Sequence, residues 1–309
     1  MRTLPAPQSG PGEVRIRVSA ASVNFPDALI IQNLYQTKPP LPFSPGSEAA
    51  GIVDAVGEGV EDFRIGDRVA AMTTWGAFAE QVVVPAARVL PLPQTMSFDV
   101  ASGFTVVYGT AIHAFAQRAA LREGETVLVL GAAGGVGLAA VEVARAMGAR
   151  VIAAASSDEK LALARRHGAE ETIDYAREDL RAGIRRITGD RGIDIVFDPV
   201  GGALAEPAFR SIGRNGRYLV VGFAAGDIPA IPLNLPLVKA AAIVGVFWGA
   251  FVVAEPEAHR RNAERLYDWH ARGLLAPEIS RVFPFEETPA AIRWVMERKA
   301  LGKVVVRMG

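Results

Sequence analysis

The chain has 309 residues, of which 50% are hydrophobic and 21% are charged, and its 33 Lys and Arg residues balance 33 Asp and Glu residues. This composition predicts a soluble globular protein of one or, more readily, two domains, and it lacks the basic excess of nucleic-acid-binding proteins. Because the sequence contains no cysteine, disulfides, thiol catalysis and cysteine-based metal sites are excluded.

The first part of the chain is predicted to form short strands. Residues 1–12 contain three prolines and no apolar core of a secretory signal peptide, so we expect the protein in the cytoplasm. Residues 13–18 alternate charged and apolar side chains, the period of a half-buried strand. A short helix is predicted at 28–31, a proline-rich loop at 38–45, and further strand-like segments at 45–53, 63–69 and 78–84. Short strands separated by glycine turns are typical of a small β-barrel.

The clearest motif lies at the middle of the chain. An aliphatic run from Thr126 to Leu130 ends in glycines and is followed at once by a helix-like pattern over 136–148. Such glycines let the chain turn tightly, let the backbone approach a pyrophosphate, and let the helix pack close to its strand. The helix N-terminus then offers N–H groups to phosphate oxygens. We therefore predict that a dinucleotide contacts Gly131, Ala133, Gly134, Gly135, Val136 and Gly137.

From this motif onward, strand and helix patterns alternate. Strands are predicted at 126–130, 151–155, 193–197, 217–222 and 242–247, and helices at 136–148, 158–167, 178–187 and 203–211. This alternation predicts an α/β fold with a doubly wound parallel sheet of the Rossmann type. After a further predicted helix at 257–272, strand-like segments at 282–285 and 303–306 are expected to complete the first domain.

The end of the second predicted strand indicates which dinucleotide binds. NAD-specific folds place an acidic residue there, about 20 residues beyond the glycine motif, to bind the ribose 2′-hydroxyl. This chain instead has Ser156 and Ser157, with Lys160 one turn into the helix. These groups can hydrogen-bond and neutralise a 2′-phosphate, which favours NADPH. In the alternative interpretation Ser157 is a helix N-cap and Lys160 a solvated surface residue, and Asp158 adds an opposing charge.

Six short motifs follow one another along the chain. They are Asn24-Phe25-x-Asp27, Pro45-Gly46-x-Glu48-x-x-Gly51, Gly66-Asp67-Arg68-Val69, Gly131 to Gly137, Asp198-x-Val200-Gly201-Gly202 and Gly302-Lys303-Val304-Val305. In this order the chain resembles, along nearly its whole length, the zinc-independent quinone oxidoreductases of the medium-chain dehydrogenase/reductase superfamily, the zeta-crystallin-like group.

The resemblance implies a domain organisation. A GroES-like substrate domain would be built from residues 1–107 and 251–309, around a Rossmann dinucleotide-binding domain at 108–250, with the active site in the cleft between them. Members usually carry further strand segments before the stretch equivalent to 5–18. We therefore expect that the chain starts late and that its barrel lacks part of an edge.

The resemblance also implies roles for individual residues. Asn24 and Thr105 would be the catalytic residues, with Asn24 facing the acceptor; its alternative role is to cap a turn before Pro26. The backbone around Gly222, Phe223 and Phe247 would hold the nicotinamide carboxamide, although Phe247 is alternatively a core residue. Tyr175 would join Lys160 at the 2′-phosphate, and Arg298 and Lys303 on the returning tail would reach phosphates, with an unrelated surface role as the alternative for Arg298.

Zinc catalysis is not expected. Zinc-type members of the superfamily bind the metal with cysteine and histidine, whereas Ser47 stands here at the position of that histidine. Without a Lewis acid, the natural reaction is NADPH-dependent hydride transfer to an electron-poor quinone or other α,β-unsaturated carbonyl. No residue is a convincing general acid, although Tyr35 and Tyr108 are candidates near the cleft.

Two other functions and a partner follow from the same residues. The alternatives are an enoyl- or acrylyl-thioester reductase, and an NADPH-binding sensor or structural protein with low turnover. The apolar run at 231–253 would pair with its equivalent in a second subunit and hide a sheet edge; otherwise it is core beneath a final helix. Since relatives commonly pair this way, we expect a homodimer through the Rossmann edge strand. The longest apolar run, 240–254, is shorter than the roughly 20 residues of a membrane helix, so no membrane or nucleic-acid partner is expected.

Overall fold

A computed structural model describes residues 3–309, which fold into two units. The first unit comprises the chain up to Val106, with Phe251–Tyr267 and Pro277–Gly309; the second comprises Val107–Ala250 and Asp268–Ala276. The predicted boundary placed all of 251–309 in the first domain, whereas residues 268–276 cluster with the second unit. One reason is a hydrogen bond of 3.1 Å from the Ala276 N–H to the buried Glu142 carboxylate.

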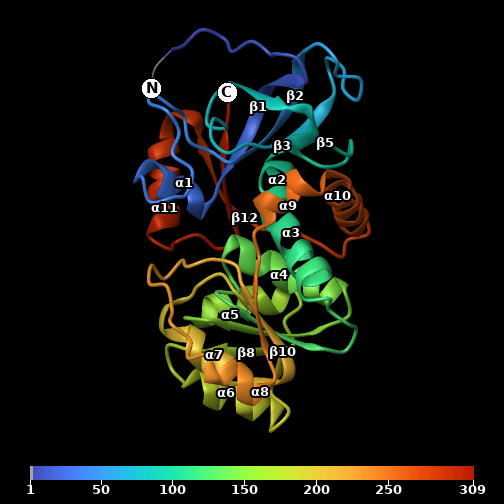
Figure 1. Ribbon diagram of the computed structural model, residues 1–309. Helices are drawn as coiled ribbons and strands as arrows, with labels where there is room; N and C mark the ends of the chain where they lie inside the picture. Colours follow the sequence, from blue (N-terminus) through green and yellow to red (C-terminus); the bar gives the residue numbers. More distant parts are fainter. Residues whose placement is uncertain (1–2) are drawn as a thin grey trace. The chain divides into compact units, whose positions relative to one another are not determined.

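The first unit is built on a seven-stranded sheet in which β1 pairs with β2, β4 and β13. Its strands are β1 (Glu13–Val23), β2 (Glu48–Val56), β3 (Arg68–Met72), β4 (Gln81–Pro85), β5 (Val89–Pro91), β12 (Ile279–Pro284) and β13 (Lys303–Arg307). Strands β1, β2, β3, β5 and β12 of this sheet are labelled in Figure 1. In β1, apolar and charged side chains alternate as predicted. Val14, Ile16 and Val18 are buried in the core, while the charged residues between them are not. The pairing of β1 with β13 shows that the two ends of the chain form one sheet, as predicted.

Helices of the first unit are α1 (Phe25–Ile31), α2 (Phe98–Ser102) and α11 (Thr288–Met296). Three further helices run across the boundaries of the units in the chain: α3 (Thr105–Ile112), α9 (Trp248–Ala254) and α10 (Pro256–Ala271). Ser97 begins α2 because its side chain accepts a hydrogen bond from the Val100 N–H. Helix α3, which begins at Thr105, follows α2 after two residues.

The second unit contains a six-stranded parallel sheet in the order β11-β10-β9-β6-β7-β8. The strands are β6 (Thr126–Leu130), β7 (Arg150–Ala155), β8 (Glu171–Asp174), β9 (Ile193–Asp198), β10 (Ile212–Val220) and β11 (Ala242–Gly245). The helices are α4 (Gly135–Ala146), α5 (Asp158–Arg166), α6 (Leu180–Thr188), α7 (Ala205–Arg210) and α8 (Asn234–Lys239). Strand order reverses at β6, which lies between β7 and β9, and doubly wound sheets bind ligands at such a reversal. The predicted fold class is confirmed.

Two differences in the second unit have local causes. The predicted strand at 242–247 ends at Gly245, because its register partner Val220 is the last residue of β10. Helix α8, which begins in the apolar stretch 231–237 and ends at Lys239, was not predicted, since the prolines and leucines of that stretch show no clear helical period. In the part of the chain from residue 3 onward, no helix combines the length and apolarity needed to cross a membrane.

Candidate functional site

The glycine turn between β6 and α4 has the geometry that a pyrophosphate needs. Gly131 has a φ of +60°, which favours glycine, and Gly134 precedes α4 without a side chain that caps the helix. A Cβ on Gly137 would overlap the Gly131 carbonyl oxygen and lie 2.9 Å from Gly131 C and 3.0 Å from Ala132 Cα. The start of α4 therefore packs directly on the end of β6, with its first N–H groups available to an anion. The remaining predicted turn residues, Ala133, Gly135 and Val136, lie on the same segment.

The predicted 2′-phosphate residues lie together at the end of β7. Ser157 accepts a hydrogen bond from the Lys160 N–H at 3.4 Å, so it is indeed the N-cap of α5. Lys160 Nζ reaches back and donates to Ser156 Oγ at 3.1 Å. An ammonium group and a hydroxyl therefore already point at each other, which is the pair of donors that a phosphate monoester requires. Tyr175 follows directly on the neighbouring strand β8 and is half-buried.

Arg177 is a residue of this region that the sequence did not reveal. Its Nη1 lies 2.7 Å from Asp158 Oδ2, and its Nε lies 3.5 Å from Asp174 Oδ2. The charge of Asp158, which counted against a 2′-phosphate, is therefore neutralised by a residue 19 positions away. Hydrogen bonding to Asp158 and the two nearby carboxylates raise the pKa of Arg177. The exposed Asp158–Arg177 pair adds no net negative charge beside Lys160.

Gly222 and Phe223, two of the predicted nicotinamide residues, lie in the loop after β10, which is hydrogen-bonded to the end of β9. The N–H groups of Val221 and Gly222 donate to the Asp198 carbonyl at 2.9 and 3.3 Å. The Asp198 side chain accepts hydrogen bonds from the N–H groups of Val200 and Gly201, and Tyr218 OH donates to its other oxygen. Burial raises the pKa of Asp198. In the motif Asp198-x-Val200-Gly201-Gly202, the aspartate therefore holds the loop beside Gly222.

The two phenylalanines of this region differ in their surroundings. Phe223 packs closely on Gly201, where a Cβ would lie 2.9 Å from its ring. Phe247 is 66% exposed, so the alternative that it belongs to the core is wrong. Its contact with the carboxamide stays a prediction.

In the first unit, a buried network surrounds the Glu48 carboxylate; we call it the Glu48 cluster, formed by Ser22, Asn24, Asp27, Ser47, Glu48 and Lys303. Glu48 Oε1 lies 3.0 Å from Lys303 Nζ and accepts a hydrogen bond of 2.8 Å from Asn24 Nδ2 and another from Ser22 Oγ. Glu48 Oε2 accepts the N–H of Val106 at 2.9 Å. A carboxylate removed from water is stable only with such partners.

The network corrects one predicted role. Lys303 is 4% exposed, and its Nζ is held by Glu48, by Asn24 Oδ1 at 2.6 Å and by the Val23 carbonyl at 3.4 Å. An ammonium group with these partners in the interior has no free N–H for a phosphate, so the predicted contact of Lys303 with phosphate is wrong. Arg298 lies exposed just beyond α11, and its role stays a prediction.

Of the two predicted catalytic residues, Asn24 belongs to the Glu48 cluster, and Thr105 is the chain neighbour of Val106, which bonds to Glu48. Asn24 is the N-cap of α1, but its side-chain amide is bonded to Glu48, Lys303 and Ser47 rather than serving the turn alone. Thr105 precedes the residue that donates to Glu48 from the other side, and its Oγ1 is buried without a hydrogen-bond partner among residues 3–309. Sequence reasoning missed Asp27, Ser47 and Glu48, although the spacing of the first two motifs contains all three.

Asp27 is a buried acid whose pKa is raised far above its usual value. It is fully buried, and this burial raises its pKa to about 7, although the Asn24 N–H, Ser47 and Lys303 act in the opposite direction. Asp27 therefore changes charge near neutral pH, which is uncommon for a carboxyl group and often marks a functional site.

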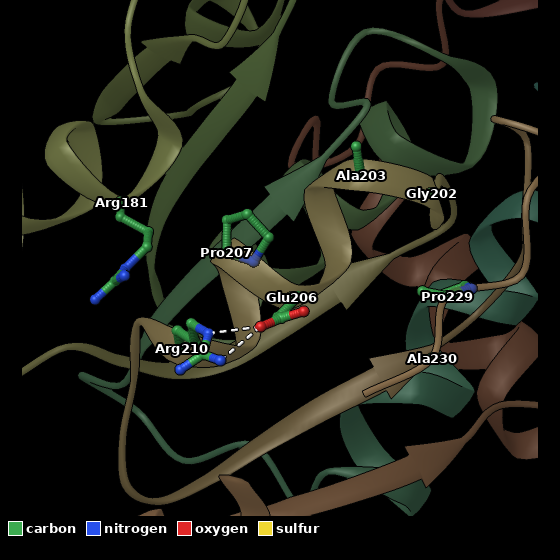
Figure 2. Close-up of a pocket in the computed structure, with 8 residues that line it drawn as sticks. All are labelled: Arg181, Gly202, Ala203, Glu206, Pro207, Arg210, Pro229 and Ala230. Carbon is green, nitrogen blue, oxygen red and sulfur yellow. Dashed lines mark hydrogen bonds and ion pairs between the residues drawn. The ribbon is translucent and has the colours of Figure 1, made fainter. Parts of the chain in front are cut away.

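A cavity of about 410 Å³ lies elsewhere on the second unit (Figure 2). It is lined by Arg181, Gly202, Ala203, Glu206, Pro207, Arg210, Pro229 and Ala230. Glu206 and Arg210 pair across one turn of α7 at 2.6 Å. None of the predicted site residues lines this cavity, so it is not the predicted dinucleotide site. Among residues 3–309, no group of three or more His, Cys, Asp or Glu side chains is arranged to hold a metal ion.

Known proteins share both halves of this arrangement. Residues 10–94 match the alcohol dehydrogenase GroES-like domain, and residues 135–265 match the zinc-binding dehydrogenase family. The chain is 37% identical over 300 residues to the rat protein called quinone oxidoreductase-like protein 2, covering 97% of this chain and 86% of that one.

Two solved structures are similar over almost the whole chain. The Escherichia coli quinone oxidoreductase complexed with NADPH has a TM-score of 0.91 and 27% identity, covering 99% of this chain and 94% of the other. A mycobacterial protein complexed with NADPH has a TM-score of 0.93 and 29% identity, with the same coverage.

Proposed function

Because this chain belongs to the quinone oxidoreductase group of the medium-chain dehydrogenase/reductase superfamily, we propose that it reduces quinones or other α,β-unsaturated carbonyls with NADPH. The chain is an NADPH-dependent oxidoreductase, as its similarity to NADPH-complexed oxidoreductases supports. The nature of the acceptor and transfer of a hydride to its carbon are the proposed parts.

The cofactor site carries this proposal. The Gly131–Gly137 turn fits a pyrophosphate, and Lys160 with Ser156 fits a 2′-phosphate next to a neutralised Asp158. Bound NADPH would supply the hydride. The protein would bind and orient the two reactants, since positioning alone accounts for much of the rate of such transfers. We also propose that no zinc takes part, because the chain has no cysteine and has Ser47 where zinc-type members have histidine.

A steady-state assay tests the function. Purified protein is mixed with NADPH and a panel of benzoquinones, naphthoquinones, enones and an enoyl thioester, and the loss of nicotinamide absorbance is followed. We expect turnover with quinones or enones. Tight NADPH binding without turnover on any acceptor would instead support the sensor or structural role, and turnover on the thioester alone would support the enoyl reductase.

Lys160→Ala is expected to weaken NADPH binding by about one to two powers of ten, on the order of 1.5–3 kcal/mol for a charge-assisted hydrogen bond. NADH binding should change little, because it lacks the 2′-phosphate. Calorimetric Kd values for both cofactors measure the difference. Arg185→Ala is the matched control, since it removes an exposed cation of the same unit whose partner is Asp190. An equal loss for NADPH and NADH in Lys160→Ala would show that this lysine does not recognise the 2′-phosphate.

We propose that the protein is a homodimer through β11. This strand is the edge of the six-stranded sheet, and its neighbourhood exposes large apolar side chains. They are Leu233, Leu237, Val238, Ile243 and Phe247. An apolar unpaired edge of this kind favours pairing with a second copy.

Ile243→Lys is therefore expected to convert a dimer into monomers at micromolar concentration, because charge on an edge strand opposes edge-to-edge pairing. Sedimentation equilibrium measures the mass. Ile65→Lys serves as the control, since Ile65 is 71% exposed in the first unit. A wild-type protein that sediments as a monomer would refute the proposal.

A further inference from the structure

Within the Glu48 cluster, Asp27 is a buried acid to which the proposed function assigns no role. Its Oδ2 accepts the Asn24 N–H at 2.7 Å, while its Oδ1 is buried and has no hydrogen-bond partner among residues 3–309. A bare carboxylate oxygen in the interior is costly, whereas a protonated oxygen is a hydrogen-bond donor. Because no donor among the described residues faces Oδ1, the surroundings of this oxygen favour the neutral acid over the carboxylate.

The charged and titratable groups around Asp27 come from separate elements. They are Glu48 on β2, Lys303 on β13 and Tyr35 beyond α1. Glu48 and burial favour the neutral acid, while Lys303 favours the carboxylate, which leaves the pKa of Asp27 at about 7. Burial, and next the charge of Asp27, raise the pKa of Tyr35, so this phenol is poorly matched to donate a proton at neutral pH.

Ser47 provides a path from Asp27 to the surface. It is half-buried, whereas Asn24, Asp27, Glu48 and Lys303 are all buried. Its Oγ accepts a hydrogen bond of 3.2 Å from Asn24 Nδ2, and it lies close enough to Asp27 to lower the pKa of that acid. A hydroxyl accepts two hydrogen bonds and donates one. Ser47 Oγ already accepts from Asn24, so it can take one further hydrogen bond, from the Asp27 acid, and its own O–H is then left to donate outward.

We propose that Asp27 and Ser47 form a proton relay to the oxygen of the reduced acceptor. This inference rests on the proposed reductase function. The acceptor gains two electrons as a hydride at carbon, and the displaced electron pair comes to rest on its oxygen. Ser47 O–H breaks and an O–H bond forms on the acceptor, while Ser47 Oγ takes the proton of Asp27. Asp27 is left as a carboxylate, stabilised by the Asn24 N–H and the charge of Lys303, and regains a proton from water.

The pH dependence of turnover tests the relay, with an enone as acceptor because its reduced anion needs a proton. Since the donor is the protonated acid, kcat of the wild type should fall as pH rises through about 7. Asp27→Asn and Ser47→Ala should each lower kcat at pH 6 by about 100-fold, the lower end of a general-acid contribution. Both should flatten the profile around pH 7, and Ser47→Thr should restore it.

Thermal unfolding of the protein without acceptor supplies a readout that does not depend on activity. Because the folded-state pKa of Asp27 is raised from 3.8 to about 7, its stabilising contribution is complete below pH 3.8 and is lost as pH rises to about 7. Asp27→Asn should therefore gain Tm relative to wild type between pH 5 and 8, by an amount that grows with pH.

The outcomes separate the relay from the reductase function. An inactive wild type with the expected Tm dependence would refute the function and, with it, the relay, while leaving the buried acid in place. An active wild type whose Asp27→Asn and Ser47→Ala variants keep its kcat and pH profile would overturn the relay. A loss confined to Tyr35→Phe would also overturn it, by making the phenol the donor. A Tm difference between wild type and Asp27→Asn that does not vary with pH would show that Asp27 is not a protonated acid.

Discussion

Lys303→Met is expected to lower the free energy of unfolding by about 3–5 kcal/mol, because it leaves the Glu48 carboxylate buried without its cation. The side chains of Lys303 and Glu48 are 5% and 1% exposed, so water cannot replace the lost partner. Urea denaturation followed by tryptophan fluorescence measures the change. Turnover should fall as well, since Lys303 also holds Asn24 Oδ1 at 2.6 Å.

Two further variants give the experiment its controls. Lys299→Met removes a lysine of the same unit from an exposed pair with Glu297 and should leave stability close to wild type. The double variant Glu48→Gln with Lys303→Met should recover part of the loss, because it removes both buried charges. If Lys303→Met were as stable as Lys299→Met, the buried pair would not hold the first unit together.

Gly137→Ala is expected to destabilise the second unit by about 1–3 kcal/mol, as overpacking does, and to weaken NADPH binding by at least about tenfold. The added methyl group would overlap backbone atoms of Gly131 and Ala132, which cannot move like a flexible side chain. Helix α4 must then shift away from β6 and carry its N-terminal N–H groups out of position. Thermal unfolding and calorimetric Kd values measure the two effects.

Gly134→Ala is the matched control on the same turn. A Cβ there meets only the Gly131 carbonyl oxygen, at 3.5 Å, and the residue has a φ of −78° that alanine adopts. The fold should therefore remain close to wild type in stability. Wild-type Tm and NADPH affinity in Gly137→Ala would contradict the role assigned to close packing at this turn.

Local sequence pattern was sufficient to predict the dinucleotide turn and the Rossmann sheet. The residues that form β6, the turn and the start of α4 are consecutive. The positive φ and the close backbone approach of this turn require glycine, and the sequence shows it at Gly131 and Gly137. Ser156, Ser157 and Lys160 are equally local, and they do meet. The strand-like tail and the resemblance both predicted that the two ends of the chain share one domain, and the pairing of β1 with β13 joins them in one sheet.

The charged network depended on tertiary structure, because burial and long-range partners are not encoded in any short stretch. Lys303 donates a hydrogen bond to an asparagine 279 positions away, and this contact shows that Lys303 is a structural cation rather than the predicted phosphate ligand. Arg177 pairs with Asp158, 19 positions away, and neutralises the negative charge that counted against NADPH. The sequence around Asp27 gives no sign of an unusual pKa, which complete burial raises to about 7. Electrostatic free energies follow solvent access, and solvent access exists only once the chain has folded.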